Sequence, residues 1–298
     1  MMSVISAKEI LKYLEICNVP FEYKGDKNIE VTGFSALDQY KIGTFTWIKS
    51  EDRFHWKREE NNITLAFVQK GVEVPVKNQI ICKASKEAFF LVIEHYYEEK
   101  REKRIGNNSI IGEKVIIGKN VYIGNNCSID GDIHIGDGTL ISDNVVIRNR
   151  VRIGERCYIQ ACTVIGEDGF GYYEDEKNVK TMIKHHGGVE IGNDVFIGAH
   201  VNIARGTISD TSIGDGAKIA PSTHIGHNDV IGNNVAVICS QLYGSVQIDD
   251  NAYVVGSIIR NQIHVGKNSL VGMGSVVTKD IDEGCIVYGS PAKVIRNR

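Results

Sequence analysis

The sequence predicts a mainly β fold in which a three-sided parallel β-helix follows a small α/β domain. Three observations carry this prediction. Isoleucine recurs at every sixth position over a long stretch, glycine often follows it directly, and the first hundred residues lack the repeat. A period of six does not match the 3.6-residue turn of an α-helix, but it suits a short strand followed by a corner.

The repeat defines the β-helix directly. Isoleucine fills eleven consecutive positions at spacing six, from Ile105 to Ile165. The same register resumes over 191–203, 213–237 and 265–277, with valine replacing isoleucine toward the end. Gly, Asn and Asp after the isoleucines supply the conformations that tight corners need. Three strand-and-corner units would close one triangular coil, so the isoleucines stack inside and successive coils pair as parallel strands.

The chain divides into three predicted segments. Residues 1–104 form the α/β domain, 105–280 form the β-helix with an excursion over 167–188, and 281–298 form a tail that covers the last coil. In the first segment, "SAKEILKYLEI" predicts a helix whose Ser6 and Glu9 have capping-box spacing. "IEVTGFSAL", "GTFTWI" and "ITLAFVQ" predict strands, and 85–103 predicts an amphipathic helix capped by Ser85.

The bulk composition excludes several classes of partner. The net charge is −3 with acidic and basic residues interspersed, which favours neither nucleic acid nor an anionic membrane. No stretch reaches the roughly 18 apolar residues of a membrane span, and the N-terminus is too polar for a signal peptide. The seven cysteines lack CxxC spacing, which indicates free thiols. We therefore expect a cytoplasmic protein.

Two histidines interrupt the repeat in "HIGHNDVIG", residues 224–232. With Ile225 pointing inward, strand alternation sends His224 outward and leaves His227 at the following corner. An imidazole titrates near neutral pH and can accept a proton from an attacking amine or hydroxyl. A solvated corner histidine would show the same spacing, so the pattern alone leaves both interpretations open.

This segment resembles the catalytic segment of two hexapeptide-repeat families, the UDP-3-O-acylglucosamine N-acyltransferases and the bacterial sugar-nucleotide N-acetyltransferases. "SALDQYKIGTFTWIKS", "DGFGYY" and "ARGTISDTSIGDGAKIAPSTHIGHN" also resemble the first family. The resemblance implies a left-handed β-helix, although crossover rules would have favoured the right hand. It also implies a homotrimer with active sites between neighbouring prisms, and His227 as the catalytic base.

The resemblance suggests further site residues. An aromatic residue matching Trp47 stacks on the nucleotide base in that family, although a core tryptophan is the plain alternative. Loop residues of the excursion match a segment near the sugar, although they could be mere surface. The substrate-binding candidates are Trp47, Gly169, Phe170, Gly171, His185 and Asn228. The backbone N–H of Gly244, 17 residues beyond His227, is the candidate that stabilises the oxyanion.

The sequence departs from the family in three places. "IARG" and "IAPS" put Ala204 and Ala220 where family members commonly have aspartate. A second family histidine corresponds to Ile263, with His264 one place off. Members that use acyl carrier protein usually carry a helical C-terminal extension, whereas this sequence ends at Arg298.

The ending instead resembles that of hexapeptide enzymes that use acetyl-CoA or another short acyl-CoA. Two glycines would let a pantetheine arm approach the backbone, and three cations could meet the coenzyme phosphates, although solvated tail cations are equally compatible. These cofactor-binding candidates are Gly272, Gly274, Lys279, Lys293 and Arg296. We therefore expect a coenzyme A thioester as co-substrate, rather than acyl carrier protein, and no metal.

The predicted function is an N-acyltransferase that moves an acetyl or short 3-hydroxyacyl group from acyl-CoA to the amine of a nucleotide-linked amino sugar, for lipopolysaccharide O-antigen biosynthesis. The nearest alternative is a lipid A-type UDP-3-O-acylglucosamine N-acyltransferase that uses 3-hydroxyacyl carrier protein. A zinc hydratase built on His186, His224 and His227, or a non-catalytic trimer, are further alternatives. The sequence leaves open which amino sugar, ring position, nucleotide and acyl length are used.

Overall fold

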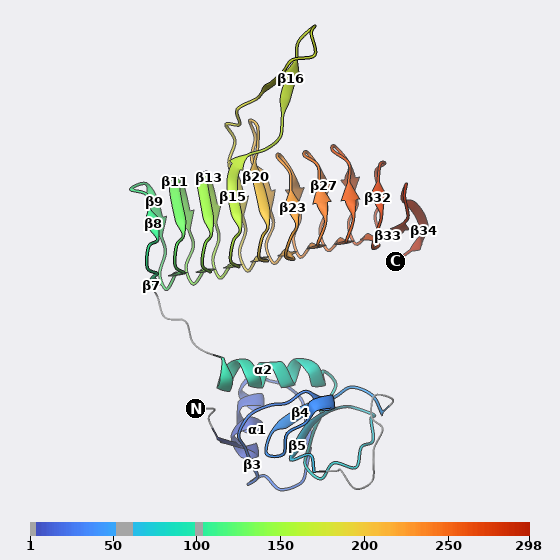
Figure 1. Ribbon diagram of the computed structural model, residues 1–298. Coiled ribbons are helices and arrows are strands. Elements are labelled where there is room, and N and C mark those ends of the chain that lie inside the picture. The colour runs from blue at the N-terminus through green and yellow to red at the C-terminus, as the bar shows by residue number, and fades with distance from the viewer. Residues whose placement is uncertain (1–3, 52–61, 99–103) are drawn as a thin grey trace. The chain divides into compact units, whose positions relative to one another are not determined.

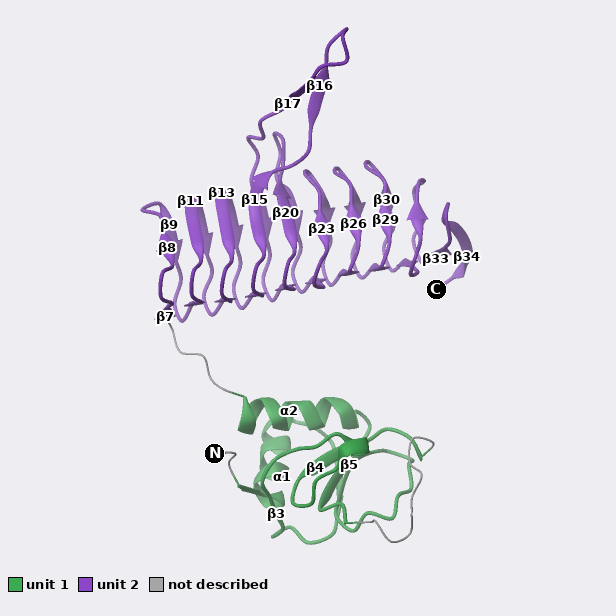
Figure 2. Cartoon of the chain, viewed as in Figure 1, with its two compact units in different colours: residues 1–100 green, residues 101–298 purple. Residues whose placement is uncertain are grey.

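The computed structural model describes residues 4–51, 62–98 and 104–298. The chain forms two compact units, residues 1–100 and 101–298 (Figure 2). We describe each unit by itself. Within the described residues, no helix is long and apolar enough to cross a membrane.

Unit 1 is a small mixed sheet with two helices, as predicted. Three neighbouring strands run parallel and the fourth pairs antiparallel at one edge. Phe45, Phe67 and Phe89 pack ring against ring in the core between sheet and helices. The elements are β1 (Ile5–Ser6), α1 (Ala7–Ile16), β2 (Glu22–Lys24), β3 (Glu30–Val31), a 3-10 turn (Leu37–Gln39), β4 (Phe45–Ile48), β5 (Leu65–Gln69), β6 (Gln79–Cys82) and α2 (Ser85–Tyr97).

Several local predictions for unit 1 can be compared with the structure. The capping box is confirmed, because Ser6 Oγ accepts the Glu9 N–H at 3.3 Å and the Glu9 carboxylate accepts the Ser6 N–H at 2.8 Å. The cap at Ser85 is wrong: α2 begins at this residue, whose buried hydroxyl donates to Gln69 Oε1 at 3.0 Å. The predicted strand over 29–37 shortens to β3, and β2 and β6 were not predicted.

Unit 2 is the predicted parallel β-helix, a stack of short strands on three faces (Figure 1). Face A contains β8 (Ile110–Ile111), β11 (Ser128–Ile135), β13 (Val146–Ile153), β15 (Val164–Asp168), β20 (Asn202–Arg205), β23 (His224–Ile225), β26 (Gln241–Leu242), β29 (Ile258–Ile259) and β32 (Val276–Val277). Face B contains β9 (Val115–Ile117), the second halves of β11 and β13, β18 (Val189–Ile191), β21 (Thr211–Ile213), β24 (Val230–Ile231), β27 (Gln247–Ile248) and β30 (His264–Val265).

Face C closes the triangle with a separate sheet. It contains β7 (Arg104–Ile105), β10 (Tyr122–Ile123), β12 (Leu140–Ile141), β14 (Tyr158–Ile159), β19 (Phe196–Ile197), β22 (Lys218–Ile219), β25 (Ala236–Ile238), β28 (Tyr253–Val255), β31 (Leu270–Val271), β33 (Cys285–Tyr288) and the antiparallel β34 (Lys293–Asn297). The hairpin of β33 and β34 ends the stack, and the Ala292 N–H between them donates to Val276 O on face A at 2.9 Å.

The isoleucine column forms the core of unit 2, as the sequence predicts. On face A the strand register aligns Ile129, Ile147, Ile165, Ile203 and Ile225, and all five are fully buried. Burying such a side chain stabilises a fold by about 1.5–3 kcal/mol. Repeating this burial in every coil fixes which residues point inward, and therefore which ones face solvent at each corner.

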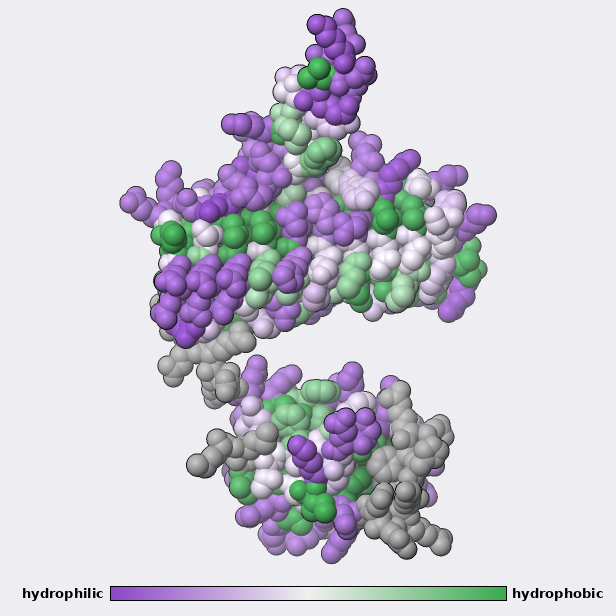
Figure 3. All heavy atoms as spheres, in the orientation of Figure 1, coloured by the Kyte–Doolittle hydropathy of each residue, from purple (hydrophilic) through white to green (hydrophobic). Residues whose placement is uncertain are grey.

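The excursion leaves the stack at the corner between faces A and B, which we call the A–B edge. Between β15 and β18 the chain forms an antiparallel hairpin of β16 (Tyr172–Glu174) and β17 (Lys180–Met182). Its outer end is mostly hydrophilic, and less polar residues gather toward its base (Figure 3). The base of the hairpin therefore adds apolar surface beside the next corners of the A–B edge.

Candidate functional site

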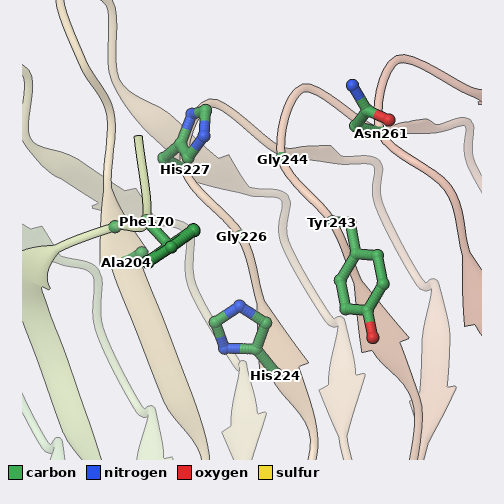
Figure 4. A pocket seen from close by; sticks show the side chains of 9 residues that line it. Phe170, Ala204, His224, Gly226, His227, Tyr243, Gly244 and Asn261 are labelled. Atoms are coloured by element: carbon green, nitrogen blue, oxygen red, sulfur yellow. The ribbon is translucent and has the colours of Figure 1, made fainter. Parts of the chain in front are cut away.

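A groove of about 410 Å³ opens at the A–B edge, beside the base of the excursion. It collects residues from the excursion, from β20, and from three later coils (Figure 4). The residues that line it are Gly169, Phe170, Ala204, His224, Gly226, His227, Tyr243, Gly244 and Asn261. The groove thus joins segments that the sequence separates by nearly a hundred residues.

His227 stands at the corner after β23, between two glycines that make room for its ring. A methyl group added at Gly244 would lie 2.9 Å from His227 Nε2, and one added at Gly169 would lie 2.9 Å from its Cβ. Gly244 also has φ +60°, a conformation that L-residues rarely adopt. Both glycines are therefore required sterically by the position of this imidazole.

A hydrogen-bond network decides which nitrogen of His227 carries its proton. Nδ1 lies 3.1 Å from Asn228 Oδ1, which also accepts the Thr207 N–H at 3.0 Å. Asn228 Nδ2 donates to Ser209 O at 2.8 Å, which fixes the orientation of the amide. Because an amide oxygen only accepts, Nδ1 of His227 must donate, and Nε2 keeps its lone pair. The free lone pair lies beside Gly244.

His224, one strand residue before Ile225, carries the opposite tautomer. Its Nδ1 lies 3.1 Å from Asn202 Nδ2, an amide nitrogen that donates, so the proton of a neutral His224 is on Nε2. Burial lowers the pKa of His224, and the charge of nearby His227 lowers it further. Figure 4 shows both rings in the groove. The groove therefore offers one acceptor nitrogen and one donor nitrogen.

His185, at the end of the excursion, packs against the ring of His227. Its ring packs edge to face against His227 with centroids 5.2 Å apart, and its Nδ1 lies 3.0 Å from Ile183 O. The residue is 3% exposed and its Nε2 has no hydrogen-bond partner. Neither His185 nor Gly171 is among the residues that line the groove. Of the candidates in the excursion, Gly169 and Phe170 therefore line the groove, whereas Gly171 and His185 do not.

Three family descriptions match parts of unit 2. Residues 132–167 match the bacterial transferase hexapeptide (six repeats), 114–149 match the hexapeptide repeat of succinyl-transferase, and 207–296 match the GMPPB C-terminal domain. A probable UDP-3-O-acylglucosamine N-acyltransferase 2 of Arabidopsis thaliana is 36% identical over 139 residues, 46% of this chain and 45% of the relative. The acyl-[acyl-carrier-protein]–UDP-N-acetylglucosamine O-acyltransferase of Pseudomonas savastanoi pv. phaseolicola is 39% identical over 108 residues, 35% of this chain and 42% of the relative.

Solved structures agree with these relatives. The UDP-N-acetylglucosamine acyltransferase of Francisella novicida superposes with TM-score 0.61 at 25% identity, covering 65% of this chain and 71% of its own. Its counterpart from Bacteroides fragilis has TM-score 0.59 at 28% identity, with coverages of 65% and 74%. The chain is related to the hexapeptide-repeat acyltransferases. It spans 34–45% of the length of the first curated relatives that it matches.

The remaining candidates belong to unit 1 or to the later coils of unit 2. Trp47 belongs to unit 1, where it is half-buried on β4 and packs against the aromatic core. Gly272 and Gly274 lie between β31 and β32. β32 is three coils beyond β23, the strand that precedes His227, which corresponds to roughly 14 Å along the stack. A side chain at Gly272 would collide with the ring of Tyr288, which explains that glycine without a ligand.

The cationic candidates sit at the end of the hexapeptide stack. Lys279 and Lys293 line a second groove of about 350 Å³ whose floor includes the apolar Val277 and Val287. Arg296 pairs through its backbone with Ile286 on β33 and is exposed. The structure therefore brings the two lysines together, but it places all of these residues at a site separate from His227.

One residue of the groove, Asn261, was not predicted from the sequence. Asn261 occupies the corner one coil beyond Gly244, and the constant spacing from His227 through Gly244 to Asn261 could have identified it. His264, considered as a shifted family histidine, is on face B instead, with Nε2 2.8 Å from Asp249 Oδ2. Ile263 beside it is buried in the core.

The zinc alternative gains no geometric support in this hexapeptide-repeat protein. Across residues 4–51, 62–98 and 104–298, no three His, Cys, Asp or Glu side chains converge on a point that could hold a metal ion. His227 and His224 each direct Nδ1 to an asparagine amide, and His186 is exposed at the end of the excursion.

Proposed function

We propose that the protein transfers a 3-hydroxyacyl group from acyl carrier protein to the amine of a UDP-linked glucosamine derivative, a reaction of the lipid A type. The observation that carries this proposal is the Nε2 lone pair of His227, held beside Gly244 in an open groove. Relatives named as UDP-3-O-acylglucosamine and UDP-N-acetylglucosamine acyltransferases support this lipid A-type reaction. They support it better than the acyl-CoA reaction of O-antigen synthesis, which the sequence alone favoured.

The geometry supports one proton path. The neutral amine attacks the thioester carbonyl and forms the C–N bond, while Nε2 of His227 accepts the amine proton. The backbone N–H of Gly244 stabilises the oxyanion that develops on the carbonyl oxygen. The C–S bond then breaks, and the leaving thiolate takes the proton from His227. The Nε2–H of His224 donates a hydrogen bond that orients the acceptor sugar.

Transfer assays with defined donors and acceptors test this proposal. We expect product from 3-hydroxyacyl carrier protein and a UDP-3-O-acylglucosamine amine, and little from acetyl-CoA or from the hydroxyl of UDP-N-acetylglucosamine. Mass spectrometry of the nucleotide sugar measures the added acyl group. Absence of product with every pair would contradict the proposal.

A second candidate keeps the groove and changes the donor to acyl-CoA. The observation that favours it is the second groove, where Lys279 and Lys293 meet and could bind coenzyme phosphates. In the same assay this candidate requires product from acetyl-CoA or 3-hydroxybutyryl-CoA but not from acyl carrier protein. Replacing both lysines by methionine should then raise the KM for acyl-CoA and leave kcat unchanged.

Substitution of Gly244 tests the space around the imidazole. Gly244→Ala should lower kcat at least ~10-fold, because the new methyl group displaces His227 Nε2 from the reaction centre. Gly138→Ala is the matched control, since Gly138 also has a positive φ but meets only a flexible arginine side chain at 3.6 Å. Equal losses in both variants would mean that backbone strain alone, and not the histidine, explains the effect.

We also propose that the protein is a cytoplasmic homotrimer in which neighbouring β-helices complete the groove. Tyr243, Tyr253 and Ile258 expose 36–50% of their surface along unit 2 and would give such neighbours an apolar contact. All seven cysteines are unpaired, which suits a reducing compartment. Sedimentation equilibrium measures the assembly, and a monomeric mass of 33.0 kDa at working concentration would contradict it.

A further inference from the structure

A carboxylate lies inside the coil that carries the two groove histidines. Asp229 is fully buried, and no other Asp or Glu side chain among the described residues is. It occupies the inward corner position four residues after a core isoleucine. Equivalent buried positions in other coils hold small apolar or hydroxyl residues: Thr163, Val195, Val201, Ala217 and Val235. Closing a coil therefore does not require an acid.

The carboxylate connects the two corners on which the proposed reaction depends. Asp229 Oδ2 accepts the N–H of Gly226, the residue before His227, at 2.7 Å. Asp229 Oδ1 accepts the N–H of Val246, two residues after Gly244, at 2.8 Å. One side chain thus fixes the backbone on both sides of the gap between Nε2 of His227 and Gly244.

The hydroxyl of Thr139 at another corner makes a different set of bonds. Thr139, at the corner between faces B and C, accepts the Cys157 N–H at 3.1 Å and donates to Gly154 O at 2.9 Å. Both of its partners belong to the next coil, so the hydroxyl only ties one coil to another. Asp229 bonds its own corner as well as the next one, which gives the pair of corners a defined separation.

The buried acid is costly to ionise. Burial raises the pKa of Asp229 to about 7, although the N–H groups of Val246 and Gly226 oppose this by stabilising the anion. No charged side chain contributes to the shift. The titratable side chains on the surrounding elements are His224 and His227 on its own coil, Tyr243 on the next, Arg205 and Asp210 on the preceding one, and His185 on the excursion.

We propose that Asp229 is a positioning residue, whose two hydrogen bonds to backbone amides hold His227 against Gly244 in the reactive arrangement. The inference rests on the proposed acyl transfer. Protonation removes one of the two acceptor oxygens and loosens the link between the corners. Full activity then requires both an ionised Asp229 and a neutral His227.

Kinetics of Asp229→Val and Asp229→Asn test this role. Valine fills the equivalent position in other coils, so Asp229→Val retains a folded β-helix, and we expect kcat to fall about 10- to 100-fold with KM for the sugar nearly unchanged. The matched control is Thr139→Val, which removes hydrogen bonds between two coils away from the groove and should leave kcat unchanged. Equal kcat for Asp229→Val and wild type would overturn the inference.

The pH dependence supplies a readout that a purely structural role would not move. Below the optimum, log kcat of the wild type should fall more steeply with decreasing pH than log kcat of Asp229→Asn, because protonation of Asp229 loosens the link between the corners. Asp229→Asn lacks the carboxyl that takes up this proton, so its rate should lose that part of the pH dependence. A slope that is the same in both proteins would contradict the role of Asp229.

Hydrogen–deuterium exchange separates failure of this inference from failure of the proposed function, because it needs no substrate. Backbone amides over 224–231 and 243–248 should exchange faster in Asp229→Val than in wild type, while those over 134–141 should not change. Unchanged exchange at both corners would overturn the link. Faster exchange in a protein that lacks acyltransferase activity would contradict only the proposed function.

Discussion

His227→Ala should lower kcat for acyl transfer 10²–10⁴-fold, the usual loss when a general base is removed. The structure supplies the reason. Asn228 Oδ1 accepts a hydrogen bond from Nδ1–H of His227, so the Nε2 lone pair lies beside Gly244 at the surface of the groove. No other nitrogen lining the groove is free to accept a proton in this arrangement, because the neutral His224 carries its own on Nε2.

The measurement is single-turnover transfer at the pH optimum, followed for wild type, His227→Ala and His186→Ala. His186 is an exposed histidine at the end of the excursion, outside the groove, and its replacement should leave the rate unchanged. Partial recovery of His227→Ala by added imidazole would support proton acceptance directly. A rate for His227→Ala within about twofold of wild type would remove His227 from the mechanism, because loss of a base costs far more.

The fold could be predicted because the same six-residue pattern of inward apolar residues occurs in every coil. Each coil contributes its own inward isoleucine or valine, and from Ile123 onward the stack buries them at one register, so an occasional break does not obscure the pattern. The position of His227 follows from the same count, since a corner residue is fixed once Ile225 points inward. Prediction was poorer in unit 1, where strands of two to five residues carry too few alternations to be recognised.

Contacts between coils were the part that sequence could not supply. Tyr288 covers Gly272 because β33 pairs with β31 as the next strand of face C, and the register of Val271 with Val287 does not follow the six-residue period. Asp229 reads as one more polar corner residue until the register shows that it faces inward and reaches Val246 in the next coil. Side-chain bonds to the backbone of a neighbouring coil depend on coil length, which drops from 18 to 17 residues at this point.

The free energy of unfolding should depend on pH through Asp229, and the direction of this dependence follows from the burial of its carboxyl group. The pKa of Asp229 is about 7 in the folded protein, against about 3.9 for an aspartate in an unfolded chain. The folded state therefore binds this proton more tightly, so protonation stabilises the fold and the contribution is lost as pH rises through 7. The loss between pH 5 and pH 8 is on the order of 3 kcal/mol, or roughly a hundredfold in the unfolding equilibrium.

Asp229→Val isolates this term, because every other titrating group is common to both proteins. Relative to wild type, the variant should gain about 3 kcal/mol in free energy of unfolding between pH 5 and pH 8. Urea unfolding at both pH values and at equal protein concentration measures the change, since assembly makes stability depend on concentration. A difference between the proteins that does not vary with pH would mean that Asp229 is already ionised at low pH. If Asp229→Val becomes relatively more stable with rising pH while its kcat falls, the carboxylate serves to position His227 and not to stabilise the fold. Buried valines at equivalent inward positions elsewhere in the stack show that a coil can close without a carboxylate.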